Sequence, residues 1–185
     1  MANIIESLLS EVLSEKTLGN VAESVGVSSE QVSEVISAAI PTLIGAMSKN
    51  ASTKEGAESL DKALEEHASK KKLDVAEEVK NADVKDGEGI LKHVLGSDLS
   101  STVSTLAKSV KIDKDQVMKI VAMVAPILLT FLASGKKSSK KESSDLSGLL
   151  GTFVTAAVSG LGKSNSSAGD VAGELVGGIL KALIK

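Results

Sequence analysis

The chain of 185 residues contains no cysteine, tryptophan, tyrosine or arginine. Without cysteine it cannot form a disulfide, a zinc–thiolate site or a thiol nucleophile. All 21 basic side chains are lysines, so the guanidinium fork that clamps phosphate and reads guanine is missing. The aromatic residues are Phe131 and Phe153, and the histidines are His67 and His93. These absences remove many of the side chains that build catalytic centres.

Positive charge is also too scarce for a typical nucleic-acid binder. The formal net charge is −3 and the pI is about 5.5, whereas proteins that bind a phosphate backbone are usually basic. Apolar residues make up 42% of the chain and charged residues 24%, which is the balance of a globular protein. Only two prolines are present, which favours helices.

The start of the sequence has no basic, signal-type segment. The longest uncharged runs, Ile120–Gly135 and Leu146–Gly162, have 16 and 17 residues. Both are shorter than the roughly 20 apolar residues that span a bilayer. We therefore expect a soluble, cytoplasmic protein without a membrane segment.

An internal repeat is the strongest signal that the sequence does contain. Residues Val21–Ser48 and Leu106–Ala133 align without a gap at an offset of 85 residues. The identical pairs are Ala22/Ala107, Ser24/Ser109, Val25/Val110, Gln31/Gln116, Val32/Val117, Pro41/Pro126 and Leu43/Leu128. The repeat predicts two tandem homologous helical units.

Each copy carries the signature of a capped helix. Ser28 and Asp113 stand at N-cap positions, where a side-chain oxygen can accept from the first free amides. Gln31 and Gln116 follow three residues later, as in a capping box. The matched glutamines therefore need no catalytic role.

A long apolar helix is expected after each cap. Its apolar residues recur at i, i+3, i+4 and i+7, and the predicted core consists of Val32, Ile36, Ile40, Leu43, Val117, Val121, Val124 and Leu128. The second copy is apolar nearly all round, which is typical of a buried helix, so we expect Val117–Ala133 at the centre of the molecule. Pro41 and Pro126 lie inside these helices, and each is expected to kink its helix.

The rest of the chain also reads as helix, and the fold class is all-α, a multi-helix bundle. Further helices are predicted over Leu18–Val25, Thr53–Lys70, Leu73–Val79, Gly89–Leu95 and Leu99–Val110, from about Ser144, and over Ala168–Ile184. The predicted organisation is a first helical unit (1–72), a charged hinge (73–89), a second unit (90–167) and a C-terminal amphipathic helix (168–185).

One combination of segments is similar to a known family. The stretch DGEGILKHVLG from Asp86 to Gly96 precedes the capped helix IDKDQVMKIVAMVAPILLTFLA, and Ala63–His67 and the Leu-Gly-rich Asp145–Phe153 fit the same pattern. The combination resembles the bacterial DUF937 family, which is related to the YidB-like proteins, over about residues 5–155. The resemblance implies an all-helical fold of two related halves, with no established biochemical activity and no catalytic residues to carry over.

A DNA-binding function is one alternative. Residues Val21–Ile36 match the generic helix-turn-helix pattern, with Gly26 in the turn. The exposed start of the second helix, however, carries Glu30 and Glu34, which DNA phosphates repel. The second copy has Lys111 in place of Gly26. A packing motif is the simpler interpretation.

A metal site at the histidines is another alternative. His67 and His93 lie on either side of the expected hinge and could approach one another, with Glu65, Glu66, Asp86 or Glu88 as a third ligand. No established metal-binding spacing is present. A histidine that caps or packs at a helix end is the simpler interpretation.

The C-terminal region favours an interaction surface. In its last predicted helix, one apolar face can be formed by Val171, Leu175, Ile179, Leu180 and Leu183. Such a face either completes the core or docks on another subunit, where it would generate an oligomer or filament. Membrane insertion is not favoured because tryptophan and tyrosine anchors are missing. The lysine-rich Gly135–Lys141 is interpreted as a solvated loop.

These patterns predict a non-enzymatic structural or interaction protein that assembles with itself. No catalytic residue, cofactor or metal ligand is predicted, and neither nucleic acid nor a membrane is expected as a partner. The alternative function is a helix-turn-helix-like DNA-associated protein.

Overall fold

Helices joined by short turns form the part of the chain that the computed structural model describes, residues 2–68, 73–139, 150, 151 and 155. They are α1 (Ala2–Val12), α2 (Glu15–Val25), α3 (Ser29–Asn50), α4 (Lys54–Glu66), α5 (Val75–Lys80), α6 (Val84–Leu95), the 3₁₀ turn η1 (Gly96–Asp98), α7 (Leu99–Val110) and α8 (Lys114–Ser139). These residues include no strand. The prediction of an all-α fold is confirmed.

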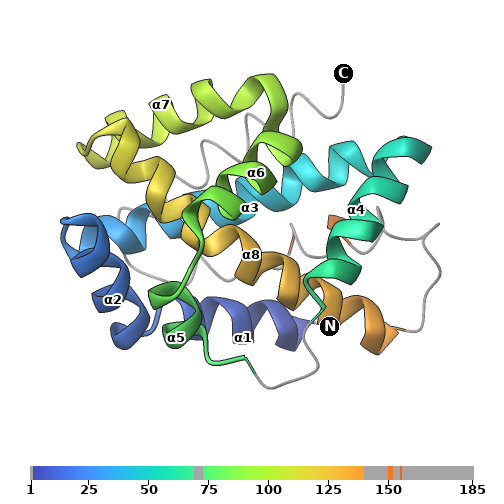
Figure 1. Cartoon of the computed structure of the whole chain (residues 1–185), viewed down its shortest axis with the longest axis horizontal. Coiled ribbons are helices and arrows are strands. Elements are labelled where there is room, and N and C mark those ends of the chain that lie inside the picture. Colours follow the sequence, from blue (N-terminus) through green and yellow to red (C-terminus); the bar gives the residue numbers. More distant parts are fainter. Residues whose placement is uncertain (1, 69–72, 140–149, 152–154, 156–185) are drawn as a thin grey trace.

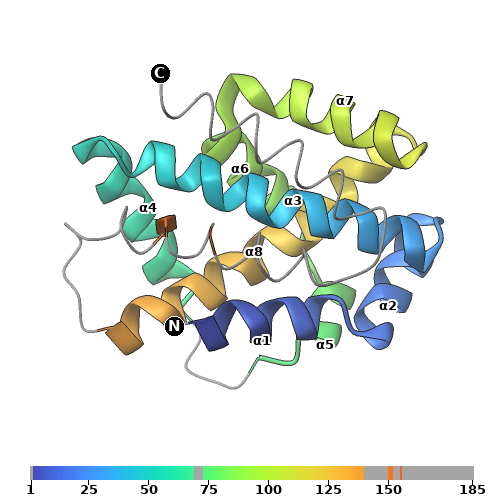
Figure 2. The same cartoon turned by 180° about the vertical axis from the view of Figure 1, so that it is seen from behind.

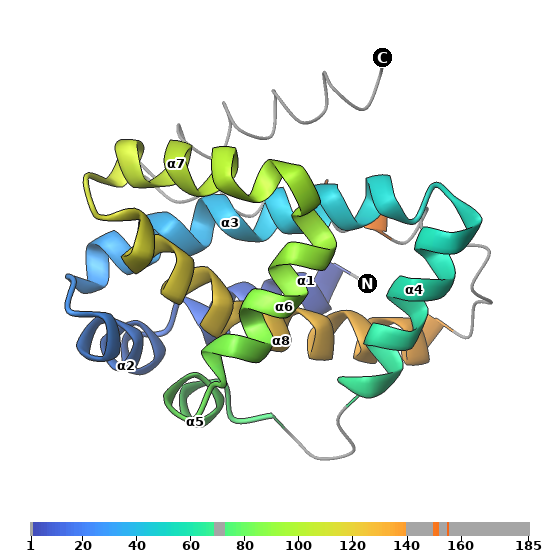
Figure 3. The ribbon, with the colours of Figure 1, turned by 45° about the horizontal axis from the view of Figure 1, so that its top comes forward.

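Helix α8 lies at the centre of the bundle and packs against each of α1 to α7. Figure 1 shows α6 crossing in front of α8, while α1 and α3 lie behind it. In Figure 2, seen from the opposite side, α1 and α3 are in front. In Figure 3, α3 and α7 run side by side along the upper edge. One continuous hydrophobic core contains residues from all eight α-helices, so α8 is the helix around which the others are arranged.

The predicted core residues are confirmed. Val32, Ile36, Ile40, Leu43, Val117, Val121, Val124 and Leu128 are each at most 4% exposed. Helix α3 is more deeply buried than its apolar stripe suggested, since every residue from Val35 to Gly45 is buried. Polar Thr42 is accommodated there because its hydroxyl donates to the Ala38 carbonyl at 2.8 Å.

The first predicted capping box is confirmed in full. The Ser28 hydroxyl accepts from the Gln31 amide at 3.2 Å, and the Gln31 side chain accepts from the Ser28 amide at 3.1 Å. At the start of α8, the Asp113 amide donates to the Gln116 side chain at 3.1 Å. Both glutamines thus satisfy backbone donors at a helix start.

Two helices begin earlier than their patterns indicate. Helix α2 begins at Glu15, because the Ser14 hydroxyl accepts from the Thr17 amide. Helix α6 begins at Val84 rather than Gly89, because Asp83 caps it. Helix α1 lies in a segment for which no helix was predicted, and the short helix predicted near residues 73–79 is α5.

The predicted hinge, residues 73–89, contains α5 and the first turns of α6. Val75 and Val79 are fully buried, and the Asn20 side-chain amide donates to the Ala76 carbonyl at 2.8 Å. This segment is therefore packed into the common core. The division of the chain into two homologous units stays a prediction.

Some predictions fall beyond the described ranges. Of the helix predicted from Ser144, residues 150, 151 and 155 are described and are helical, and Leu150 is buried. The helix predicted over Ala168–Ile184 and the five apolar positions of the predicted interface lie outside the described residues. Within the described part, the segment Lys114–Gly135 is long and apolar enough to cross a membrane by length and composition alone, and 67% of its most apolar window is buried inside the bundle.

Candidate functional site at the α6 crossing

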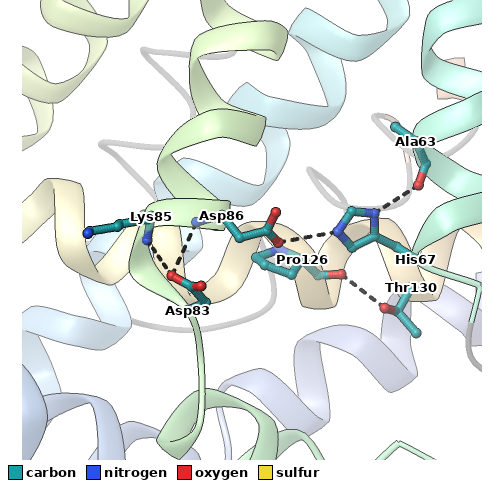
Figure 4. A network of polar contacts seen from close by, with 7 residues as sticks. All are labelled: Ala63, His67, Asp83, Lys85, Asp86, Pro126 and Thr130. Carbon is teal, nitrogen blue, oxygen red and sulfur yellow. Dashed lines mark hydrogen bonds and ion pairs between the residues drawn. The ribbon is translucent and has the colours of Figure 1, made fainter.

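Helix α6 contains most of the DGEGILKHVLG segment, and its start is fixed by Asp83. The Asp83 Oδ1 atom accepts from the amides of Lys85 at 2.9 Å and Asp86 at 3.4 Å. The cap provides a hydrogen-bond acceptor for two of the backbone amides that have no partner within the helix. Figure 4 shows this cap beside the contacts of Asp86.

Gly87 lets α6 approach α8 closely. It is buried, and a Cβ atom at this position would overlap the Ala122 carbonyl group. The proline four residues after Ala122 has no N–H, so Pro126 cannot donate to this carbonyl as an ordinary helical residue would. The Gly87 Cα–H occupies the direction of the missing Cβ and therefore faces the carbonyl oxygen. Gly87 of α6 therefore faces a carbonyl oxygen that Pro126 of α8 leaves without its usual helical hydrogen bond.

His67 lies near this crossing, directly after the end of α4. Its Nδ1 atom contacts the Ala63 carbonyl at 2.9 Å, and its Nε2 atom contacts the Asp86 carboxylate at 3.5 Å. The His67 side chain is 21% exposed and that of Asp86 is 55% exposed. Figure 4 shows the imidazole between α4 and α6, above the Pro126–Thr130 turn of α8.

A pocket of about 220 Å³ adjoins this pair. Its floor is apolar and comes from Met123, Pro126 and Ile127 of α8, whereas its rim carries the carboxylates of Glu78, Asp83 and Asp86. Thr130 closes one side, and its hydroxyl donates to the Pro126 carbonyl at 3.0 Å. Around His67 the rim is therefore acidic.

His93, near the other end of α6, faces a separate pocket of about 500 Å³ between α3, α4 and α6. Its Nε2 atom and the Ser59 hydroxyl of α4 form a hydrogen bond of 2.8 Å. A serine nucleophile requires an imidazole that a third group holds in place. Within the described part of the chain, His93 Nδ1 makes no hydrogen bond, and the residue is exposed. The contact is best understood as a link between α4 and α6.

The alternative in which the two histidines share one site does not fit the structure. His67 contacts Asp86 and His93 contacts Ser59, each beside its own pocket. The described residues contain no group of three or more histidine, aspartate or glutamate side chains arranged to hold a metal ion. The sequence placed both histidines beside the hinge, but it could not show that His93 contacts the middle of α4 while His67 follows its C-terminal end.

The helix-turn-helix pattern is realised as local geometry. Helices α2 and α3 are joined by Gly26, whose φ of 78° is left-handed, followed by the Ser28 cap. Because α3 is buried from Val35 to Gly45, only its first turns could contact DNA. The exposed residues in its first turn are Ser29 and Glu30. This turn has no lysine or arginine, and DNA phosphates would repel Glu30.

Comparison with known proteins places this bundle in a family. No curated protein and no solved structure matches the chain. The model of a family described as bacterial proteins of unknown function, DUF937, matches residues 7–135. That range contains α2 to α7, most of α1 and α8, and the whole α6 crossing. The chain therefore belongs to the DUF937 family of bacterial proteins.

Proposed function

We propose that this protein is a non-enzymatic, cytoplasmic interaction module that assembles with copies of itself through its C-terminal segment. The family match ends at residue 135 and the described bundle at 139. The five apolar residues of the proposed interface, Val171, Leu175, Ile179, Leu180 and Leu183, come after both. They recur at helical spacing, as expected of an amphipathic contact surface.

The main support for this proposal is that the apolar side chains of the described bundle are themselves shielded from solvent. Among residues 6–68 and 73–135, no alanine, valine, leucine, isoleucine, methionine or phenylalanine is exposed. The apolar side chains that are not buried there, such as Leu18 and Phe131, are partly covered, whereas an interface is usually marked by a large exposed apolar patch. We therefore assign the apolar contact with another subunit to the C-terminal pattern.

The test is the molar mass of the full chain by size exclusion with light scattering. We expect a multimer for the wild type and an 18.9 kDa monomer for the double variant Leu175→Ser/Ile179→Ser. The matched control Glu174→Ser/Lys181→Ser changes polar residues of the same segment and should keep the multimer. A wild type that stays monomeric at every concentration would overturn the proposal.

DNA association remains the alternative, based on the α2–Gly26–α3 geometry. A gel shift with random duplex DNA at low salt separates the two functions, because non-specific binding is strongest there. We expect no shift, as the net charge is −3. A salt-dependent shift would favour the DNA function instead.

A further inference from the structure

Both histidines of the chain connect the same two helices. The Ser59–His93 contact joins α4 to the last turn of α6, and the His67–Asp86 contact joins the end of α4 to the first turn of α6. Only two residues of α4, Leu60 and Leu64, are buried. Two polar links therefore supplement a small apolar anchor.

The two links respond differently to protonation. Nδ1 of His67 faces a carbonyl oxygen and Nε2 faces a carboxylate oxygen, and both of these can only accept hydrogen bonds. A neutral imidazole has one N–H, whereas the imidazolium has two. Only protonated His67 can satisfy both contacts at once, and it then also forms an ion pair with Asp86.

The charged groups around His67 reinforce this dependence. Helix α6 and its cap contribute Asp86 and Asp83, and α5 contributes Glu78 to the same pocket. Helix α8 contributes only uncharged residues to that pocket. Helix α4 presents its C-terminal end, where the helix dipole favours a cation, and its neighbouring Glu65 and Glu66 are acidic. The groups facing the ring from these elements are negative or uncharged.

His93 provides an internal contrast. Its Nε2 atom faces a hydroxyl, which can donate to a neutral imidazole or accept from a protonated one. This link therefore persists in both protonation states.

We propose that His67 is a pH-dependent latch that fastens the C-terminal end of α4 to α6. The latch is closed when the imidazole is protonated and loosens when it is neutral. The latch therefore contributes to the attachment of α4 at acidic pH and is lost as the pH rises. This device does not depend on whether the chain assembles with itself.

The test is hydrogen exchange of the α4 amides in the full chain at pH 5.5 and pH 8.0, corrected for the intrinsic pH dependence of exchange. An exposed ion pair is worth little, so Asp86→Asn should speed α4 opening about 2- to 5-fold at pH 5.5. At pH 8.0 the same substitution should leave only the smaller effect of removing an acidic residue from the first turn of α6. His93→Gln is the matched control and should change opening equally at both pH values.

An Asp86→Asn effect of the same size at both pH values would overturn the proposal, as would no effect at pH 5.5. If Asp86→Asn perturbs the whole fold, the double variant His67→Gln/Asp86→Asn decides the question. The latch requires the two substitutions to be more strongly coupled at pH 5.5 than at pH 8.0.

Discussion

The pairs α2–α3 and α7–α8 are built from the same local devices but occupy different places in the fold. Each pair is joined through a left-handed residue, Gly26 with φ 78° in one and Lys111 with φ 58° in the other. Each long helix contains a proline, and each is entered past a first-turn glutamine that bonds the preceding backbone. Yet α8 packs against all seven other α-helices, whereas α3 lies to one side of it.

The different positions of α3 and α8 come from the helices that cross them. Helix α6 can sit directly on α8 because Gly87 has no side chain to separate it from the Ala122 carbonyl. The position of a helix in this bundle is thus decided by the fit of its neighbours, while its ends are decided by nearby residues. Each of the following substitutions tests one side of this comparison.

The largest effect is expected in the matched core positions Leu128 and Leu43, which are 0% and 1% exposed. Replacing either leucine by alanine leaves a cavity and should cost about 2–5 kcal/mol. Leu128→Ala should cost more, because α8 is shared by every other helix. Urea unfolding followed by circular dichroism measures both. A larger loss for Leu43→Ala would show that α3 is the true centre of stability.

The crossing itself is tested by Gly87→Ala, with Gly89→Ala as its matched control. An added methyl at Gly87 overlaps backbone, so we expect a loss of about 1–3 kcal/mol. At Gly89 nothing lies within 4 Å, and alanine should stabilise the helix by about 0.5–1 kcal/mol. Thermal unfolding of the two variants should give shifts of opposite sign. Equal shifts would mean that α6 does not contact α8 through Gly87.

Removal of the first cap has a smaller expected effect. Ser28→Ala removes the acceptor of the Gln31 amide and should cost about 1 kcal/mol. Ser29→Ala, one position further on, removes a neighbouring exposed hydroxyl and should change stability by less than about 0.5 kcal/mol. Urea midpoints measure both. A midpoint for Ser28→Ala equal to that of the wild type would show that the capping box contributes nothing to α3.

Effects of similar or smaller size are expected at the two left-handed turns. Lys111→Gly should stabilise the protein by about 0.5–1 kcal/mol, because φ of 58° strains a residue that has a Cβ. Gly26→Ala should destabilise by about 1 kcal/mol for the same reason. Differential scanning calorimetry can resolve these opposite shifts. A loss of stability in Lys111→Gly would imply that the lysine side chain itself contributes to the α7–α8 turn.

The sequence was most informative where the signal is local. The Ser28–Gln31 box, the bounds of α7 and the burial of α8 follow from residues within a few positions of one another, and all were predicted. The early start of α6 was missed because two glycines weaken its helical pattern, while the decisive Asp83 cap lies further upstream.

The candidate site was harder to predict, because its contacts join distant parts of the chain. The Gly87–Ala122 contact spans 35 residues, and the Ser59–His93 contact spans 34. Periodicity within one helix does not report which carbonyl on another helix a glycine will face. The histidines were singled out as residues of interest, but their partners depend on the tertiary arrangement.

The central position of α8 has a consequence for folding during synthesis on the ribosome. Because α8 is the last of the described helices that the ribosome makes, α1 to α7 are synthesised before the surface that they all share. At roughly 5–20 residues per second, making the 26 residues of α8 takes about 1–5 s. During that interval the apolar residues of α1 to α7 that pack against α8 have no partner. Such exposed apolar surface is prone to aggregate, and it is the kind of surface that chaperones bind.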